Sequence, residues 1–396
     1  MVVAQVNPPR GMRDFLPSEK AKRERLLAVA KNAYLNRGFQ EIETPVLEEL
    51  SRLQSGQGGD NEKLVFKVQK RGEEFASALE AGSELADLGL RFDLTVPLTR
   101  YYATNQAKLP RVFKAIQTGP VFRAERPQKG RYRQFIQCDI DILGDSSILA
   151  ELELLSASLS ALSDMGVTGA TIRVNHRELL RSNIESLGVS EADSLSAMIT
   201  IDKLDKVGIE GVALELGEKF GPAVSAAATK WLSSIDTQQI PQQLAPLFEA
   251  EFSAQLRYDP TLVRGMGYYT GSIFEIEHPE SSSSIGGGGR YDGMVGRWLG
   301  DDVPAVGISL GIERIVDLVH SASSMRPGLV LLIDGPEDAA RAMRIQAELI
   351  QKYRVRLELK PKNLKAVLAE LADSFDFFAS LGEVENATQL EIKPLG

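Results

Sequence analysis

The chain contains few residues that could carry out sulfur or imidazole chemistry. Its 396 residues include one cysteine, Cys138, and three histidines, His176, His278 and His320. A single cysteine cannot form a disulfide within the chain, which is typical of a protein in the reducing cytoplasm. Because the histidines lie far apart and outside the glycine- and arginine-rich motifs, catalytic triads and histidine-rich metal sites are not expected. We expect structural or surface histidines and a buried thiol at Cys138.

Three further signals are absent. No apolar run approaches the roughly 20 residues that a membrane span needs, and Met1 to Arg10 lacks the apolar segment of a signal peptide. The sequence also lacks the GxxxxGK[ST] motif of P-loop nucleotide-binding proteins. With 43% apolar residues, 25% charged residues and a net charge of −9, we expect a cytoplasmic globular protein of two or three domains, with no membrane partner.

One short segment is strongly basic against this acidic background. Residues 122–135, FRAERPQKGRYRQF, contain four arginines and one lysine. They lie between the strand-like segments 111–122 and 132–143, around Pro127 and Gly130, which predicts a hairpin with a basic loop. Arginine forks match phosphate and carboxylate oxygens, so the hairpin is a candidate phosphate clamp. A solvated charged turn is the alternative.

The second strand of this hairpin alternates polar and apolar side chains. Gln137, Asp139 and Asp141 share one face, and the residues between them are apolar. Because side chains alternate across a strand, the pattern predicts the floor of a polar site. A strand that faces bulk water would show the same pattern.

Hydrophobic spacing and breaker residues predict the other elements of the first half of the chain. The expected elements are a helix from Pro17 to Gly38, a strand at 39–43, a mobile loop at 51–62, a strand at 91–95 and a helix at 147–165.

Residues 176–250 are rich in Ala, Ser, Leu and Glu, which predicts a helical insertion between two halves of one sheet domain. After it we expect a strand at 272–277. A glycine run at 286–289 would let backbone approach a ligand closely, or form a flexible loop. A strand at 305–310 then runs into a helix at Gly311.

The last residues, 326–396, alternate between strand and helix patterns, which predicts a small α/β domain. The expected strands are 328–333, 355–359, 376–381 and 389–392, and the expected helices are 336–352 and 364–371.

Together these segments resemble the histidyl-tRNA synthetase family, which belongs to the class II aminoacyl-tRNA synthetases. Over nearly the whole chain, five motifs occur in the family's order. The segment around Pro45 is similar to motif 1, residues 118–144 to motif 2 and residues 307–314 to motif 3. Residues 262–271 (LVRGMGYYTG) and 287–293 (GGGRYDG) are similar to two motifs of the histidyl family.

The resemblance implies an α+β fold, in which an antiparallel class II sheet is flanked by helices. Residues 1–175 and 251–325 would form the catalytic domain, and residues 176–250 its helical insertion. Residues 326–396 would form a short α/β domain like an anticodon-binding domain. Motif 1 implies a homodimer.

The implied activity is that of a histidine–tRNA ligase, which activates L-histidine with ATP and Mg²⁺ and transfers it to tRNA(His). By the resemblance, Arg123 would bind the α-phosphate and the substrate carboxylate. Glu125 and Arg131 would contact the nucleotide, and Arg314 would hold its γ-phosphate. Arg264 would reach the α-phosphate where a metal ion would otherwise lie, so no protein metal ligands are expected.

The resemblance also assigns six residues to the histidine substrate: Asp93, Thr95, Gln137, Asp141, Tyr268 and Tyr269. The first three would bind its amino group, and Tyr269 would lie close to its imidazole. Such placed polar groups penalise other side chains, which would leave them unpaired.

The sequence departs from the family pattern in two places. Gly267 stands where many members carry aspartate, and the C-terminal unit is short for an anticodon-binding domain. Two other functions therefore stay open. One is a histidine-binding regulatory subunit of ATP phosphoribosyltransferase, and the other is a synthetase-like enzyme that activates an amino acid without the usual tRNA.

Overall fold

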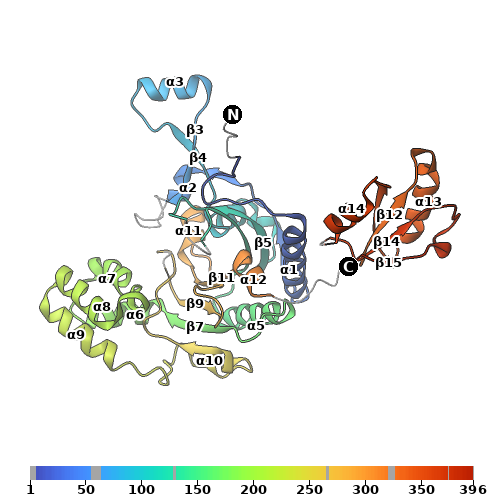
Figure 1. Ribbon diagram of the computed structural model, residues 1–396. Coiled ribbons are helices and arrows are strands. Elements are labelled where there is room, and N and C mark those ends of the chain that lie inside the picture. The colour runs from blue at the N-terminus through green and yellow to red at the C-terminus, as the bar shows by residue number, and fades with distance from the viewer. Residues whose placement is uncertain are drawn as a thin grey trace. The chain divides into compact units, whose positions relative to one another are not determined.

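Two compact units make up the chain, residues 1–320 and 321–396 (Figure 1). The structure is a computed structural model that describes residues 6–54, 64–127, 131–264, 267–319, 326–372 and 374–395.

An eight-stranded sheet forms the centre of the larger unit, in the order β1-β5-β6-β11-β10-β9-β7-β8. The six inner strands, from β5 to β7 in this order, are antiparallel to one another, as predicted. The outermost pairs, β1–β5 and β7–β8, are parallel. The strands are β1 (Gln40–Ile42), β5 (Phe113–Phe122), β6 (Gln134–Leu143), β7 (Thr171–His176), β8 (Leu256–Tyr258), β9 (Ser272–Glu277), β10 (Gly286–Arg290) and β11 (Ala305–Gly311).

Three helices cover the apolar face of this sheet: α1 (Pro17–Leu35), α5 (Ile148–Asp164) and α12 (Ile312–Leu318). The predicted first helix forms because Leu26, Ala30 and Ala33 recur at helical spacing and are all buried. It ends before Gly38, which takes a positive φ of 80° that favours glycine. The helices pack on the apolar side chains of β6, so its polar side chains face the opposite side of the sheet.

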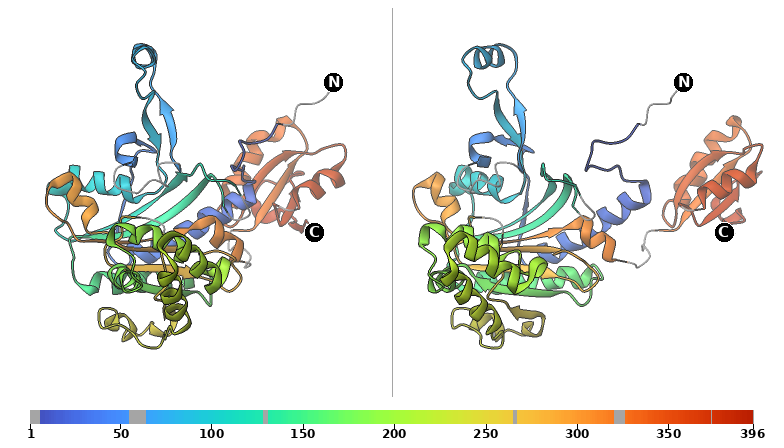
Figure 2. Two further views of the ribbon diagram at one scale, coloured as in Figure 1. Left: turned by 90° about the vertical axis from the view of Figure 1, so that its left-hand side faces the viewer. Right: turned by 60° about the vertical axis from the view of Figure 1, so that its left-hand side comes forward.

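A smaller sheet, in the order β2-β4-β3, extends from the central sheet and carries α3 (Gly72–Glu80) at its far end (Figure 2). Its strands are β2 (Leu47–Glu49), β3 (Phe66–Gln69) and β4 (Ala86–Leu90). Residues 51–54 of the predicted mobile loop belong to α2 (Leu50–Gln54). That part of the prediction is wrong, and residues 55–62 lie outside the described residues.

The prediction of a strand at 91–95 is also wrong. β4 ends at Leu90 and α4 (Thr95–Asn105) begins at Thr95. The reason is a side-chain bond, in which the backbone N–H of Val96 donates to Asp93 Oδ1 at 3.1 Å. An aspartate that accepts from the first turn of a helix favours a helix start over continued strand pairing.

The segment predicted as helical, residues 176–250, is helical and packs within the larger unit. Its first four helices share a hydrophobic cluster of their own and lie together at the lower left of Figure 1, whereas its last helix packs on the core of the central sheet. None of the helices in the described part of the chain combines the length and apolar character that a bilayer crossing requires. The helices of the segment are α6 (Arg177–Ser186), α7 (Ser194–Ile201), α8 (Leu204–Phe220), α9 (Pro222–Ser233) and α10 (Ala245–Phe248).

The smaller unit is the predicted α/β structure, with a sheet in the order β13-β12-β14-β15. The prediction of a strand at 389–392 is wrong, because pairing with β14 occurs only at the two residues that follow, Lys393 and Pro394. Pro394 has no N–H that could extend the hydrogen-bond ladder. The elements are β12 (Gly328–Ile333), α13 (Ala339–Leu349), β13 (Arg354–Leu359), α14 (Leu364–Leu371), β14 (Phe377–Ser380) and β15 (Lys393–Pro394).

Candidate active site

The polar face of β6 forms the floor of a buried site. Gln137, Asp139 and Asp141 expose only 6%, 3% and 4% of their surfaces. Asp139 lies opposite Ser309, and Asp141 lies opposite Gly307, across the β6–β11 ladder. The predicted polar floor is therefore confirmed, and the alternative of a water-facing strand is wrong.

Two adjoining cavities lie over this floor. One has a volume of about 350 Å³ and the other about 50 Å³, and Arg123, Gln137 and Arg264 line both. All eleven residues predicted for the site line one cavity or the other. The larger cavity is lined by Glu125, Arg131 and Arg314 in addition to the shared residues, and the smaller by Asp93, Thr95, Asp141, Tyr268 and Tyr269.

The larger cavity concentrates positive charge. Arg123, just beyond β5, donates from Nε to the Phe92 carbonyl at 3.0 Å, and Arg131 forms an ion pair with Glu125 at 3.6 Å. Burial and the nearby arginines, Arg131 first, lower the pKa of Arg314. The arginines repel one another within the cavity. A polyanion such as a triphosphate would relieve this repulsion, so the cavity is suited to bind one.

The smaller cavity instead concentrates carboxylates. Burial raises the pKa of Asp93 to about 6, although the Val96 N–H and Arg123 act in the opposite direction. Burial also raises the pKa of Asp141 to about 7, against a hydrogen bond that Tyr291 donates at 2.5 Å. Burial and then Asp141 hold the pKa of Asp139 well above its usual range.

Three acceptor atoms in this cavity are buried without a hydrogen-bond partner: Asp93 Oδ2, Gln137 Oε1 and Asp139 Oδ1. Buried polar groups are normally paired, so these oxygens indicate a ligand that brings several N–H donors. An amino acid with an ammonium group and an imidazole ring has that chemistry.

The glycine run is part of strand β10, so the alternative of a flexible loop is wrong. A Cβ on Gly287 would lie 2.7 Å from Arg264 Cζ, and a Cβ on Gly289 would lie 2.8 Å from Tyr269 Cδ1. The missing side chains therefore make room for two site residues, a specific use of glycine in a strand.

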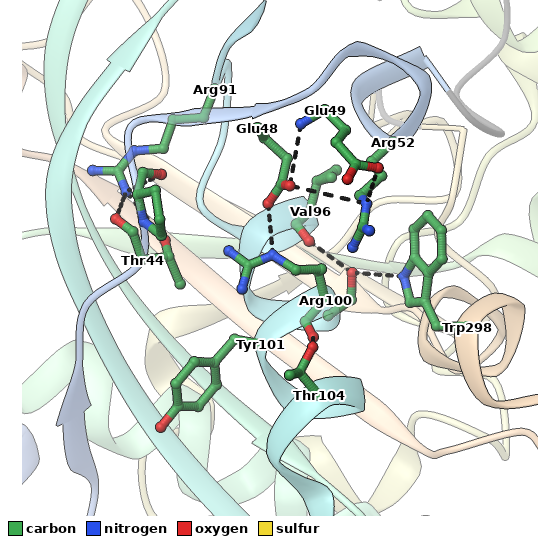
Figure 3. Close-up of polar contacts among 12 residues, drawn as sticks. Thr44, Glu48, Glu49, Arg52, Arg91, Val96, Arg100, Tyr101, Thr104 and Trp298 are labelled. Atoms are coloured by element: carbon green, nitrogen blue, oxygen red, sulfur yellow. Dashed lines mark hydrogen bonds and ion pairs between the residues drawn. The ribbon is translucent and has the colours of Figure 1, made fainter. Parts of the chain in front are cut away.

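The first turn of α4 places Thr95, and contacts from distant segments fix this helix (Figure 3). The buried carboxylate of Glu48 accepts from Arg100 Nε at 2.8 Å. Trp298, on α11 (Gly293–Leu299), donates from Nε1 to Thr99 Oγ1 at 3.3 Å. Glu48, close to the predicted motif 1, and Trp298 thus fix the helix that places Thr95 beside the smaller cavity.

The sequence prediction assigned no role to several other residues that line the site, among them Asp139, Glu275, Tyr291 and Ser309. The alternation along β6 placed Asp139 on the polar face without assigning it a role. Tyr291 lies within a recognised motif, but its bond to Asp141 depends on strand pairing. Glu275 had no sequence signal, because a glutamate in a strand usually faces solvent.

The residues set aside as structural are mostly confirmed as such. Cys138 is fully buried, and burial raises the pKa of its thiol. His278 Nε2 lies 2.8 Å from the Thr168 carbonyl oxygen, and His176 Nδ1 accepts from the Glu178 N–H at the start of α6. His320 lies outside the described residues.

Comparisons with known proteins agree with this geometry. The family model described as histidyl-tRNA synthetase matches residues 11–315. The chain is 48% identical to a histidine–tRNA ligase of Leifsonia xyli, covering 100% of this chain and 99% of that protein. It is 34% identical to the corresponding ligase of Phocaeicola vulgatus, covering 99% of this chain and 95% of that protein.

Solved structures show the same fold. A histidyl-tRNA synthetase from a Nostoc species superposes with a TM-score of 0.76 at 26% identity, covering 99% of this chain and 95% of that one. A Bacillus halodurans protein, described as an ATP phosphoribosyltransferase regulatory subunit/histidyl-tRNA synthetase, gives 0.71 at 19% identity, covering 94% and 97%. The second likeness concerns the fold alone. From the matched family model and the near full-length relatives, the chain belongs to the histidyl-tRNA synthetase family.

Proposed function

We propose that this protein is a histidine–tRNA ligase. The observation that carries the proposal is the junction of the two cavities, where unpaired acceptors for an amino acid meet arginines suited to a triphosphate. Gln137, Arg123 and Arg264 line both cavities, so a bound amino acid and ATP would react between them. The Leifsonia and Phocaeicola relatives, which carry the name histidine–tRNA ligase, support this assignment.

In the proposed reaction, a carboxylate oxygen of histidine attacks the α-phosphorus, and the bond to the bridging oxygen breaks to release pyrophosphate. Charge spreads over the equatorial oxygens in the transition state. Arg123 and Arg264 stabilise that charge, while Glu125, Arg131 and Arg314 bind the nucleotide. Preorganised donors of this kind supply most of the rate enhancement, and no protein nucleophile is needed. A ribose hydroxyl of tRNA then attacks the adenylate and releases AMP.

Mg²⁺ enters as part of the ATP complex in this proposal. Glu125 lines the larger cavity, and Mg²⁺ prefers carboxylate ligands together with phosphates and water. Within the described residues, no three His, Cys, Asp or Glu side chains are grouped as a metal site. The ion would neutralise phosphate charge, while the arginines orient the α-phosphate.

Amino-acid-dependent ATP–pyrophosphate exchange tests the function, with each of the twenty amino acids in turn. Exchange with histidine alone is expected. Histidine binding without exchange would indicate the regulatory subunit instead. Exchange with another amino acid would mean that Gly267 marks a changed pocket. Charging of tRNA(His) then distinguishes the ligase from an enzyme that activates histidine for another acceptor.

Histidine binding should weaken as the pH falls. The ammonium group pairs with ionised carboxylates, and the pKa values of Asp93 and Asp141 are about 6 and 7. Protonation of Asp93 alone should weaken binding about tenfold between pH 7 and pH 5. Calorimetry across this range measures the effect, and Asp93→Asn should flatten the profile although free histidine still titrates. An equally steep profile in that variant would contradict the assignment.

The free energy of unfolding of the ligand-free protein should instead increase as the pH falls. Because the folded-state pKa values of these two carboxyls are raised, they contribute stability below about pH 4 that is lost as the pH rises through 6 to 7.

A homodimer and a cytoplasmic location belong to the same proposal. β1 lies at the edge of the central sheet, next to β5. Large apolar side chains are exposed at Leu35 and Leu47, on either side of β1 in the chain, and at Val112, which precedes β5. A free strand edge with exposed apolar groups favours association. Light scattering at micromolar concentration should give about twice the mass of one chain. A monomer would count against a class II enzyme.

A further inference from the structure

A buried arginine beside the proposed catalytic cavity is surrounded by carboxylates. Arg173, on β7, exposes 8% of its surface. Its guanidinium lies 2.5 Å from Asp259, 3.1 Å from Glu277, and 3.3 Å from both Glu275 and Asp205. Four negative carboxylates surround the single positive charge of Arg173. Some of them are therefore expected to have another partner or another function.

Glu275 has that second partner. Its Oε1 accepts from Arg173 Nη1 at 3.3 Å, and its Oε2 accepts from Arg264 Nη1 at 3.0 Å. The same side chain lines the larger site cavity and a neighbouring cavity of about 580 Å³ that Arg173 also lines. One carboxylate therefore joins the buried arginine to the proposed catalytic arginine.

Asp205 adds a contact from the helical segment. It lies at the start of α8, whereas Glu275 and Glu277 lie on β9 and Asp259 follows β8. A continuous series of ion pairs thus runs from α8 through Arg173 and Glu275 to Arg264.

Among the described residues, the hydrogen bond that orients the guanidinium of Arg264 is the one to Glu275. Arg264 Nε is buried without a hydrogen-bond partner, and Gly287 beneath it has no side chain to pack against. A long side chain loses much rotamer freedom when ordered, so an ion pair that holds it before the substrates arrive reduces that cost in the reaction.

We propose that Glu275 is a positioning residue for Arg264, and that Arg173 and Asp205 make this positioning depend on the placement of the α8 segment. The inference rests on the proposed function. Because Glu275 also pairs with Arg173, its ion pair with Arg264 is weaker than it would otherwise be. When the phosphates bind, Arg264 can then leave the carboxylate at a small energetic cost.

Glu275→Gln tests the positioning, with Glu277→Gln as a matched control. Both glutamates lie on β9 and contact Arg173, but Arg264 pairs only with Glu275 among them. Glu275→Gln should lower kcat for pyrophosphate exchange about tenfold or more. It should leave KM for histidine within about twofold and tighten ATP binding about two- to fivefold, because a negative charge near the phosphates is removed.

Glu277→Gln should change neither quantity by more than about twofold. Equal losses in the two variants, or ATP binding that is unchanged or weaker in Glu275→Gln, would overturn the proposal. If the wild-type protein exchanges with no amino acid, the proposed function fails. The ATP affinities of the two variants, measured by calorimetry, would then still test whether Glu275 pairs with Arg264 near the phosphates: ATP should bind more tightly to Glu275→Gln than to Glu277→Gln.

A double-mutant cycle tests the connection to α8. Asp205→Asn and Glu275→Gln should be non-additive in kcat by at least about threefold, because both act through Arg173. Glu210→Gln, an exposed change on the same helix, should combine additively with Glu275→Gln. Additivity in both pairs would remove the dependence on α8.

Discussion

Replacing Arg264 with glutamine should slow histidine-dependent pyrophosphate exchange by about 10²–10³-fold, the effect of losing one preorganised charge-stabilising donor. Arg264 lines both cavities, where the histidine carboxylate and the α-phosphorus would meet. Its charge would be needed most in the transition state, so kcat should fall much more than KM rises. Exchange kinetics at several histidine and ATP concentrations separate the two parameters.

The matched control for this change is Arg257→Gln. Arg257 also pairs with a β9 glutamate, at 2.9 Å from Glu277, but it is largely exposed and lines neither site cavity. Loss of an exposed ion pair costs little, so this variant should keep activity within about twofold. A comparable loss in both variants would show that Arg264 acts only through folding.

Alanine at Gly307 should raise KM for histidine by about 10- to 100-fold. A Cβ at this position would overlap the carboxylate of Asp141, which lies opposite it across the β6–β11 ladder. Asp141 would then have to leave its hydrogen bond with Tyr291. Leaving a buried polar group unpaired costs about 1–3 kcal/mol, which corresponds to this loss of affinity. ATP affinity should change much less.

Gly293→Ala is the corresponding control, since a Cβ there would meet nothing within 4 Å. Gly293 opens α11, where alanine is favourable. This variant should match the wild type in histidine KM, and its melting temperature should not fall. If Gly307→Ala raised KM for ATP and histidine equally, a general distortion of the sheet would explain the result better than displacement of Asp141.

Local patterns predicted most elements correctly. The β5–β6 hairpin and α1 could be found because period-two or helical spacing was bounded by glycine or proline. One error occurred where a side chain overrode the pattern. At 91–95 the alternation was real, but the bond from the Val96 N–H to Asp93 starts a helix there instead.

The candidate site shows a similar division. The eleven predicted site residues came from the resemblance to the family, and all of them line the two cavities. Ser309 was missed because its partner lies far away in the chain, and Glu275 because its role depends on Arg173, 102 residues away. Ser309, for example, accepts from Gln137 Nε2 at 2.5 Å only because β6 and β11 are neighbours in the sheet.

The sequence by itself determined the element types, the basic hairpin, the polar face of β6 and the family, because each is written in residues close together in the chain. Only the tertiary structure decided that this face is buried, that Gly287 makes room for Arg264 and that Glu275 joins Arg264 to Arg173. The burial of β6 and the Glu275–Arg173 pair depend on strand order and register, which bring together segments more than a hundred residues apart. Burial, in turn, raises the pKa of Asp93 and Asp141, because removing a carboxylate from water disfavours its charged form.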